Sequence, residues 1–306
     1  MSTIATPAFF VAGAQKSGTT SLWAYLRQHP DLYLPEPKEP HFWCGPGDGT
    51  PPEWSGDGDE HLVRQFVWDP DHYSAIYQDG GHLLAGDCST LYLVDPGVER
   101  RIAAARPDAR VVALLRDPVQ RAHSAWRMWR NSGLEDLTFS DALEIEDERI
   151  AAGWSPAYAY RANGLYATHV DRWLEVWPRD QLLLLRTDEL AATPLETMRA
   201  VFEFLGVDPS FTPDVAERHN VRGDAVRSLR VAGMLRKRSR WKSLALRVVP
   251  PEVRQPAGRR LRSANTDRRA PDASTLADLR RFYSADLDRL ESLTGWDLTS
   301  WRNGSS

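Results

Sequence analysis

Short apolar runs alternate with helical patterns along this chain, and this alternation constrains the fold more than any other feature of the sequence. The runs occupy residues 8–13, 82–87, 109–116 and 181–186 and are apolar almost throughout. Strands without a polar face are typical of parallel sheets that helices cover on both sides. We therefore predict an α/β fold, a single domain over residues 1–306 with a central parallel β-sheet flanked by helices.

The helices between these runs carry recognisable start and stop residues. Asp95 and Asp117 each precede a proline, and a capping side chain followed by proline is typical of the first turn of a helix. Gly206 is the expected C-cap of another helix. The predicted helices cover residues 17–29, 95–105, a stretch that starts at 117, and residues 163–177, 193–205 and about 273–293, while residues 45–59 are predicted to form a surface loop.

The composition is that of an ordinary globular protein. Of the 306 residues, 42% are hydrophobic and 26% are charged, which is enough for a substantial core. Cys44 and Cys88 cannot form a disulfide framework, and no Cys/His cluster has the spacing of a zinc site, so we predict no metal. Because the N-terminal residues lack a secretory signal pattern and no apolar run approaches ~18 residues, we expect a cytoplasmic protein without a transmembrane segment.

Basic side chains are concentrated in one segment of an otherwise acidic chain. Residues 218–269 contain 16 Arg or Lys against 3 acidic residues, whereas the whole chain has a net charge of −4. Such a block is typical of contact with nucleic acid, an anionic membrane surface or an anionic ligand, or of solvated helix faces. Trp241 is its only aromatic residue, so a single-strand stacking platform is absent and nucleic acid is not favoured. We predict a basic helical cap or lid at about 218–270, which leaves peripheral membrane contact open.

The first predicted strand leads directly into a turn rich in glycine and hydroxyl groups, AGAQKSGTTS (12–21), which opens the first helix. Gly13 and Gly18 allow close backbone approach, N–H groups at the helix start point toward a ligand, and Lys16 adds a positive charge. The pattern predicts an anion cradle in a P-loop-nucleotide-binding-like fold. It is not a Walker A loop, in which the lysine follows the second glycine. The order found here suits a nucleotide with a single 5′ phosphate-like group.

Together with LLRDPVQRAHSAW (114–126), this turn resembles the motifs of sulfotransferases that use 3′-phosphoadenosine 5′-phosphosulfate (PAPS). The resemblance extends over residues 7–296, and KEPHFW (38–43) is most similar to the heparan-sulfate-type and related bacterial branch. It implies that PAPS is the co-substrate and that Arg116, Ser124 and, in a late loop, Arg268 bind its phosphates. Arg116 ends an apolar strand, where its guanidinium can clamp a phosphate bidentately. The residues that the resemblance assigns to the 5′-phosphosulfate are Lys16, Ser17, Gly18, Thr19, Thr20 and Ser21.

The acceptor side is predicted in the segment LYLPEPKEPHFW (32–43). On an extended backbone, Glu39 and His41 project together and Lys38 projects to the opposite side. A positioned base that takes the proton of an acceptor hydroxyl is worth about 10²–10⁴-fold in rate. By the resemblance, Glu39 matches the family's catalytic glutamate and His41 a histidine near it. We therefore expect Glu39 to be the base, His41 to orient or assist it, and Lys16 to stabilise the leaving group.

Some positions depart from the heparan-type pattern. Where those enzymes have Glu-Lys-Thr-Pro-x-Tyr, the lysine falls on Cys88, which we expect to be a small core residue. Asp87 and Ser89 are expected to line the site. Tyr166, at the start of a predicted helix, is a further match that a packing role explains equally well.

The predicted activity is transfer of a sulfuryl group from PAPS to a hydroxyl of a carbohydrate, glycolipid or secondary-metabolite acceptor, which yields a sulfate ester and the bisphosphate PAP. Two alternatives stay open: an NTP-dependent small-molecule kinase, which the position of Lys16 disfavours, and a non-catalytic protein that binds anionic surfaces. Trp43 and Trp54 are expected to suit stacking on a sugar or an aromatic ring. The sequence identifies neither the acceptor nor the oligomeric state.

Overall fold

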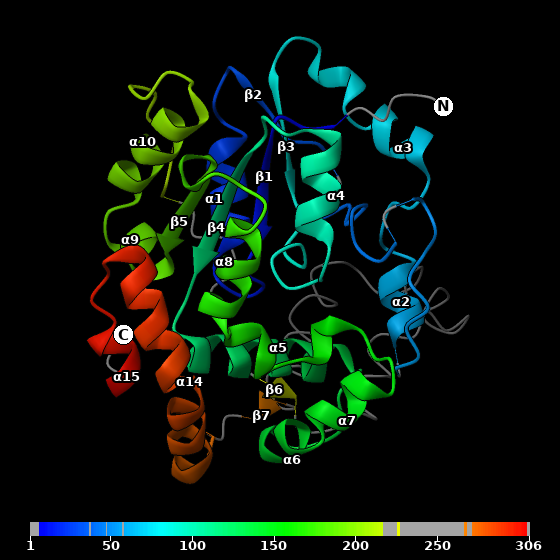
Figure 1. Cartoon of the computed structure of the whole chain (residues 1–306), viewed down its shortest axis with the longest axis vertical. Helices are drawn as coiled ribbons and strands as arrows, with labels where there is room; N and C mark the ends of the chain where they lie inside the picture. The colour runs from blue at the N-terminus through cyan, green and yellow to red at the C-terminus, as the bar shows by residue number, and fades with distance from the viewer. Residues whose placement is uncertain are drawn as a thin grey trace, which may run out of the picture.

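Five parallel strands form a central sheet in the order β2-β3-β1-β4-β5 (Figure 1). The computed structural model describes residues 6–36, 38–46, 48–56, 58–216, 225–226, 266–267 and 271–304. The strands are β1 (Phe9–Gly13), β2 (Leu32–Tyr33), β3 (Leu84–Cys88), β4 (Arg110–Leu115) and β5 (Leu182–Arg186). The predicted parallel sheet is confirmed, and four of its strands are the apolar runs of the sequence.

Helices cover both faces of the sheet, which explains why its strands are so apolar (Figure 1). In β1, Phe10 and Ala12 belong to one hydrophobic core and Phe9 and Val11 to a second core on the other face. Both sets of side chains are removed from water, so neither face selects polar residues. The first core is completed mainly by α4 (Val98–Ala105), α5 (Pro118–Ser132), α8 (Tyr166–Leu174) and α14 (Ala273–Thr294), and the second by α1 (Thr19–Leu26), α9 (Thr187–Ala192) and α10 (Pro194–Leu205).

The start of α5 and the end of α10 follow the predicted cap chemistry. The Asp117 carboxylate accepts hydrogen bonds from the backbone N–H groups of Val119 (2.9 Å) and Gln120 (3.2 Å). Gly206 adopts the left-handed conformation at the C-cap of α10, with φ of 73°. The final helix α14 matches the prediction within a residue.

The predicted N-cap of α4 is wrong. The helix begins at Val98, after Gly97 in the left-handed conformation (φ 88°). The Asp95 carboxylate instead accepts a hydrogen bond from the Gly45 backbone N–H at 2.8 Å. A distant loop therefore competes with the helix for this side chain, and the N-cap lies two residues later than predicted, at Gly97.

Short helices were missed by the sequence patterns, because five or six residues are too few to show a helical period. The helix predicted at 163–177 is likewise divided into a 3₁₀ turn and the shorter α8. The missed elements include α2 (Asp59–Val63), α3 (Pro70–Ala75), α6 (Phe139–Glu144), α7 (Glu146–Ala151), α15 (Thr299–Asn303) and the 3₁₀ turns Gln78–Gly80, Pro156–Tyr158, Ala162–Gly164 and Arg179–Gln181.

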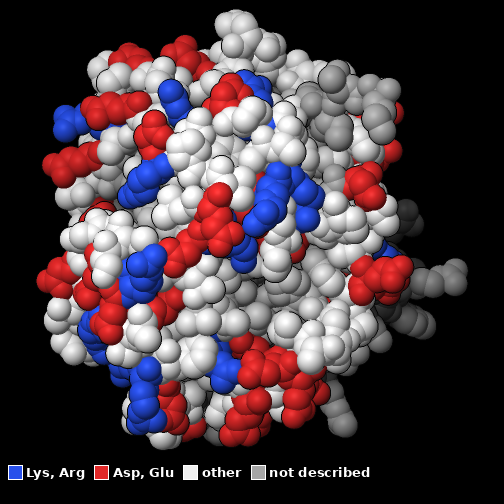
Figure 2. Space-filling model, in the orientation of Figure 1, with Lys and Arg blue, Asp and Glu red and all other residues white. Residues whose placement is uncertain are grey.

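The basic segment is described only where β6 (Ala225–Val226) pairs antiparallel with β7 (Thr266–Asp267). The predicted cap over about 218–270 otherwise lies outside the described residues. On the face seen in Figure 2, acidic and basic side chains are interspersed. In the part of the chain that the structure describes, no helix has the length and apolar character needed to span a bilayer.

Candidate active site

The turn between β1 and α1 contains two residues with positive φ, Lys16 (72°) and Gly18 (92°). Gly18 is the N-cap of α1 and, as a glycine, has no side chain that could accept a hydrogen bond from the helix. A residue with a Cβ would be strained at this φ. No capping side chain therefore covers the positive end of the helix dipole. A helix N-terminus of this kind, next to a lysine, is suited to binding an anion.

The ends of three strands meet at this turn. The hydroxyl of Thr187, which follows β5, lies within hydrogen-bond distance of the carbonyl oxygens of Ser17 (2.6 Å) and Leu115 (2.9 Å). Arg116, which follows β4, donates from Nη1 to the carbonyl oxygen of Lys16 (3.2 Å), 100 residues away in sequence. Because parallel strands end at the same edge of a sheet, the two motifs of the sequence come together there.

Three side chains contact the Glu39 carboxylate. Lys38 Nζ donates to Oε1, the Thr90 hydroxyl donates to Oε2 (3.1 Å), and His41 Nε2 lies 3.2 Å from Oε2. The Glu39 side chain is 33% exposed, whereas that of His41 is 4% exposed. The Glu39 carboxylate is thus the member of the pair that solvent can reach, whereas the His41 imidazole is almost fully buried.

The prediction that Lys38 projects away from Glu39 is wrong, because this segment is not extended. Glu39 and His41 have φ of 65° and 53°, in the left-handed region, so the alternation of a strand does not apply. Tertiary hydrogen bonds hold this turn: the His41 N–H donates to the Ser89 hydroxyl (3.0 Å), and the Val67 N–H donates to the carbonyl of residue 40 (2.8 Å).

Burial and charge act differently on the two central ionisable groups. Burial lowers the pKa of Lys16, and the nearby Arg116 charge adds to this effect, while Glu39 opposes it. Burial alone would raise the pKa of Glu39, but the His41 hydrogen bond and the Lys38 charge outweigh it and keep this pKa well below its ordinary value. Glu39 is therefore an ionised carboxylate at neutral pH.

A cleft of about 1420 Å³ brings most of the predicted site residues together. Ser17 is fully buried and does not line it, and Arg268 lies outside the described residues. The predicted residues that line the cleft are Lys16, Gly18, Thr19, Thr20, Ser21, Glu39, His41, Arg116 and Ser124.

Other expectations about the site are settled by burial. Asp87 and Ser89 do not line the cleft formed by the described residues, because both are fully buried. Cys88 is a core residue, as predicted, and burial raises the pKa of its thiol to about 12. Tyr166 is also buried; burial raises its pKa to about 12, opposed in part by the neighbouring Arg121 charge.

No sequence pattern indicated Lys38 and Thr90 as partners of Glu39, and none indicated the apolar side of the cleft. The Phe66 ring packs 4.2 Å from the His41 ring, next to Glu39. Trp43 and Trp54, expected to stack on an acceptor, do not line the cleft formed by the described residues. The apolar lining consists mainly of Leu62, Phe66, Leu91, Met128, Trp129 and Leu134, and much of it comes from α2 and from loops for which the sequence carried no periodic signal.

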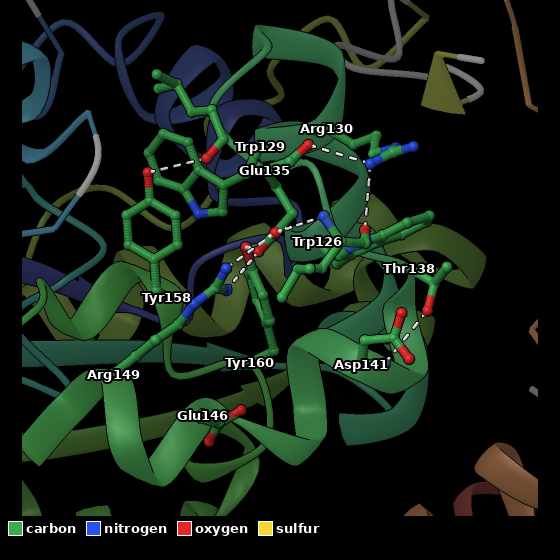
Figure 3. A network of polar contacts seen from close by, with 12 residues as sticks. Trp126, Trp129, Arg130, Glu135, Thr138, Asp141, Glu146, Arg149, Tyr158 and Tyr160 are labelled. Atoms are coloured by element: carbon green, nitrogen blue, oxygen red, sulfur yellow. Dashed lines mark hydrogen bonds and ion pairs between the residues drawn. The ribbon is translucent and has the colours of Figure 1, made fainter. Parts of the chain in front are cut away.

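Figure 3 shows a buried polar network around Glu135 and Arg149. Glu135, next to Leu134 in the chain, forms a bidentate ion pair with Arg149 of α7, with N–O distances of 2.6 and 3.1 Å. The Tyr160 hydroxyl donates to the same carboxylate (2.9 Å), as does the Leu137 N–H (3.0 Å). The network ties the loop after α5 to α7 and so fixes the position of the cleft wall.

The fold and the cleft define a P-loop-like α/β protein in which the turn before α1 and an ionised carboxylate face a common cavity. The sulfotransferase domain family matches residues 100–241. A solved sulfotransferase from Alicyclobacillus acidocaldarius is 33% identical and covers 98% of this chain and 100% of its own, with a TM-score of 0.73. The chain belongs to the sulfotransferase family, whose donor is PAPS.

Curated relatives are larger proteins. The human bifunctional heparan sulfate N-deacetylase/N-sulfotransferase 2 is 26% identical over 303 residues, which are 96% of this chain and 30% of the relative. Human carbohydrate sulfotransferase 15 is 26% identical over 247 residues, which are 66% of this chain and 44% of the relative. The chain thus spans less than half the length of these two relatives.

Proposed function

We propose that this protein transfers a sulfuryl group from PAPS to the hydroxyl of an acceptor. The observation that carries the proposal is that Lys16, in the turn before α1, and the ionised Glu39 line one cleft. A cation at a helix N-terminus suits a phosphosulfate, and a carboxylate nearby suits removal of a hydroxyl proton. Membership of the sulfotransferase family supports this activity over a kinase and over non-catalytic anion binding.

The residues present fit such a donor. Two cations, Lys16 and Arg116, line the cleft together with the hydroxyls of Thr19, Thr20 and Ser124. Burial and the Arg116 charge lower the pKa of Lys16. A bound anion would therefore stabilise the charged form of Lys16 against both effects. When bound, the donor supplies an activated sulfuryl group and a phosphate leaving group. Lys16 and the α1 N-terminus would hold its 5′ end, and Arg116 with Ser124 its 3′-phosphate.

Glu39 is the base in this proposal. It takes the proton of the acceptor hydroxyl as the acceptor oxygen bonds to sulfur and the bond from sulfur to the phosphate oxygen breaks. Lys16 stabilises the negative charge that develops on that phosphate. His41 orients the Glu39 carboxylate through Nε2, because its own ring is almost fully buried.

The lining of the cleft favours an acceptor with an apolar portion. Phe66, Trp129 and Leu134 contribute apolar surface beside the polar centre. Among the described residues, the lysine and arginine side chains of the lining are Lys16 and Arg116, proposed to bind the donor, and Lys38, which is paired with Glu39. The apolar lining supports a glycolipid or a secondary-metabolite alcohol as the acceptor.

The proposal is tested with ³⁵S-labelled PAPS and three acceptors: 2-naphthol, octyl glucoside and desulfated heparin. Replacement of Glu39 by Gln is expected to lower kcat by about 10²–10⁴-fold while the Kd of PAP, measured by calorimetry, stays unchanged. Lys16→Ala should weaken PAP binding and also lower kcat. The control is Glu36→Gln, an exposed glutamate of the same segment that pairs with Arg27. Absence of transfer by the wild type to all three acceptors, or full kcat in Glu39→Gln, would refute the proposal.

A further inference from the structure

Asp87, at the end of β3, is a fully buried carboxylate that does not line the cleft formed by the described residues. Three hydroxyl groups donate hydrogen bonds to it. Ser89 donates to Oδ1 (2.6 Å), and Tyr73 and Tyr92 donate to Oδ2 (2.8 and 2.9 Å). A carboxylate that is removed from water needs such donors, and here all of them are supplied by hydroxyls.

The same three hydroxyls also accept hydrogen bonds from the turn that follows Glu39. The His41 N–H donates to the Ser89 oxygen (3.0 Å). The Trp43 backbone N–H donates to the Tyr92 oxygen (3.3 Å), and the Trp43 ring N–H donates to the Tyr73 oxygen (3.0 Å). Each hydroxyl therefore stands between Asp87 and one N–H group of residues 41–43.

The charge of Asp87 sets the direction of these hydrogen bonds. A hydroxyl has a single proton, so a hydroxyl that donates to a carboxylate presents its oxygen to other donors. An ionised Asp87 accepts from all three hydroxyls and leaves all three oxygens for the N–H groups of His41 and Trp43. An amide at position 87 would offer donors of its own, which would turn hydroxyl protons toward the turn and leave buried N–H groups unpaired.

The turn needs such support because its backbone is strained. Glu39 and His41 both adopt positive φ although neither is glycine. Residues in this region cost about 1–3 kcal/mol each and persist only where the surroundings hold them. The hydrogen bond from His41 to Ser89 is made at one of the two strained residues, and the His41 ring contacts the Glu39 carboxylate.

We propose that Asp87 is a positioning residue for catalysis: through the hydroxyls of Ser89, Tyr73 and Tyr92 it holds the turn that presents Glu39 and His41 to the acceptor. The inference rests on the proposed function of Glu39 as the base. It gives Asp87 no contact with substrate, so its effect should pass through Glu39 alone.

The test compares Asp87→Asn with the wild type in the ³⁵S-PAPS assay. The expected result is a fall in kcat of about 10- to 100-fold, with the KM for PAPS and the Kd of PAP unchanged. Asp286→Asn is the matched control, because it removes a buried aspartate that binds the N–H groups of α8 instead of the turn. It should leave kcat unchanged. Ser89→Ala, a smaller change that removes one of the three hydroxyls, should also lower kcat.

A double-mutant cycle separates positioning from general loss of structure. In the Glu39→Gln background, Asp87→Asn should lower the residual turnover no further, because its effect passes through the missing carboxylate. An undiminished kcat in Asp87→Asn, or a loss of the same factor in both backgrounds, overturns the inference. If the wild type sulfates none of the acceptors, the proposed function fails. The positioning role of Asp87 is then tested by the crystal structure of Asp87→Asn. An unmoved Glu39–His41 turn in that structure overturns the inference, and a displaced turn supports it.

Discussion

Removal of the Glu135 charge should be among the most destabilising single changes in the cleft wall. The Glu135 side chain is 0% exposed and that of Arg149 8%, so Glu135→Gln leaves a guanidinium buried without its counter-charge (Figure 3). Breaking a buried pair from one side costs about 3–5 kcal/mol. The carboxylate also accepts from Tyr160 and from the Leu137 N–H, and a glutamine amide can satisfy only part of this set. We expect a loss of at least about 3 kcal/mol.

The assay is urea unfolding at neutral pH, followed by tryptophan fluorescence. The control is Glu60→Gln, which breaks an i,i+4 pair with Arg64 whose side chains are 79% and 72% exposed. Exposed pairs of this kind contribute about 0–1 kcal/mol. A double variant, Glu135→Leu with Arg149→Met, removes both charges and should lose much less than Glu135→Gln alone. A Glu135→Gln variant no less stable than Glu60→Gln would refute the reasoning.

Three other outcomes follow from burial. Burial lowers the pKa of His123 to about 4, so the unfolded chain binds the His123 proton more tightly than the folded chain does. The resulting contribution to folding stability is present above pH 6.5 and is lost as the pH falls toward 4. In urea unfolding, His123→Phe should therefore lose less stability than the wild type over that pH range, and equal losses would contradict the reasoning. Gly86→Ala would bring a Cβ to 2.1 Å from the Phe9 ring, so we expect a destabilisation of about 1–3 kcal/mol by thermal unfolding; an unchanged Tm would show that the sheet adapts. Cys44 and Cys88 are buried with raised pKa values, and a thiol reagent such as DTNB should label them only in denaturant; prompt labelling of the native protein would argue against their burial.

The site follows from the sequence where its residues are local to a strand end. The turn 12–21 and the start of α5 were both predicted, because a glycine-rich turn and the Asp117 cap form from neighbouring residues. Parallel strands end at one edge, so the sequence also implied that Arg116 would lie near Lys16, as their hydrogen bond shows.

The acceptor side was predicted less well, because distant contacts override local patterns there. The turn at Glu39 and His41 is left-handed instead of extended and is held by Ser89, 48 residues away from His41. The apolar lining comes partly from α2, which is too short to show a helical period. Asp87, which was predicted to line the cleft, is fully buried.

The sequence alone thus determined a parallel α/β sheet with a glycine-containing turn at its carboxyl edge, since apolar runs, caps and glycines act over a few residues. Only the tertiary structure decided which groups surround Glu39 and which carboxylate supports its turn. Those depend on hydrogen bonds and packing between segments far apart in the chain, and no local pattern encodes them.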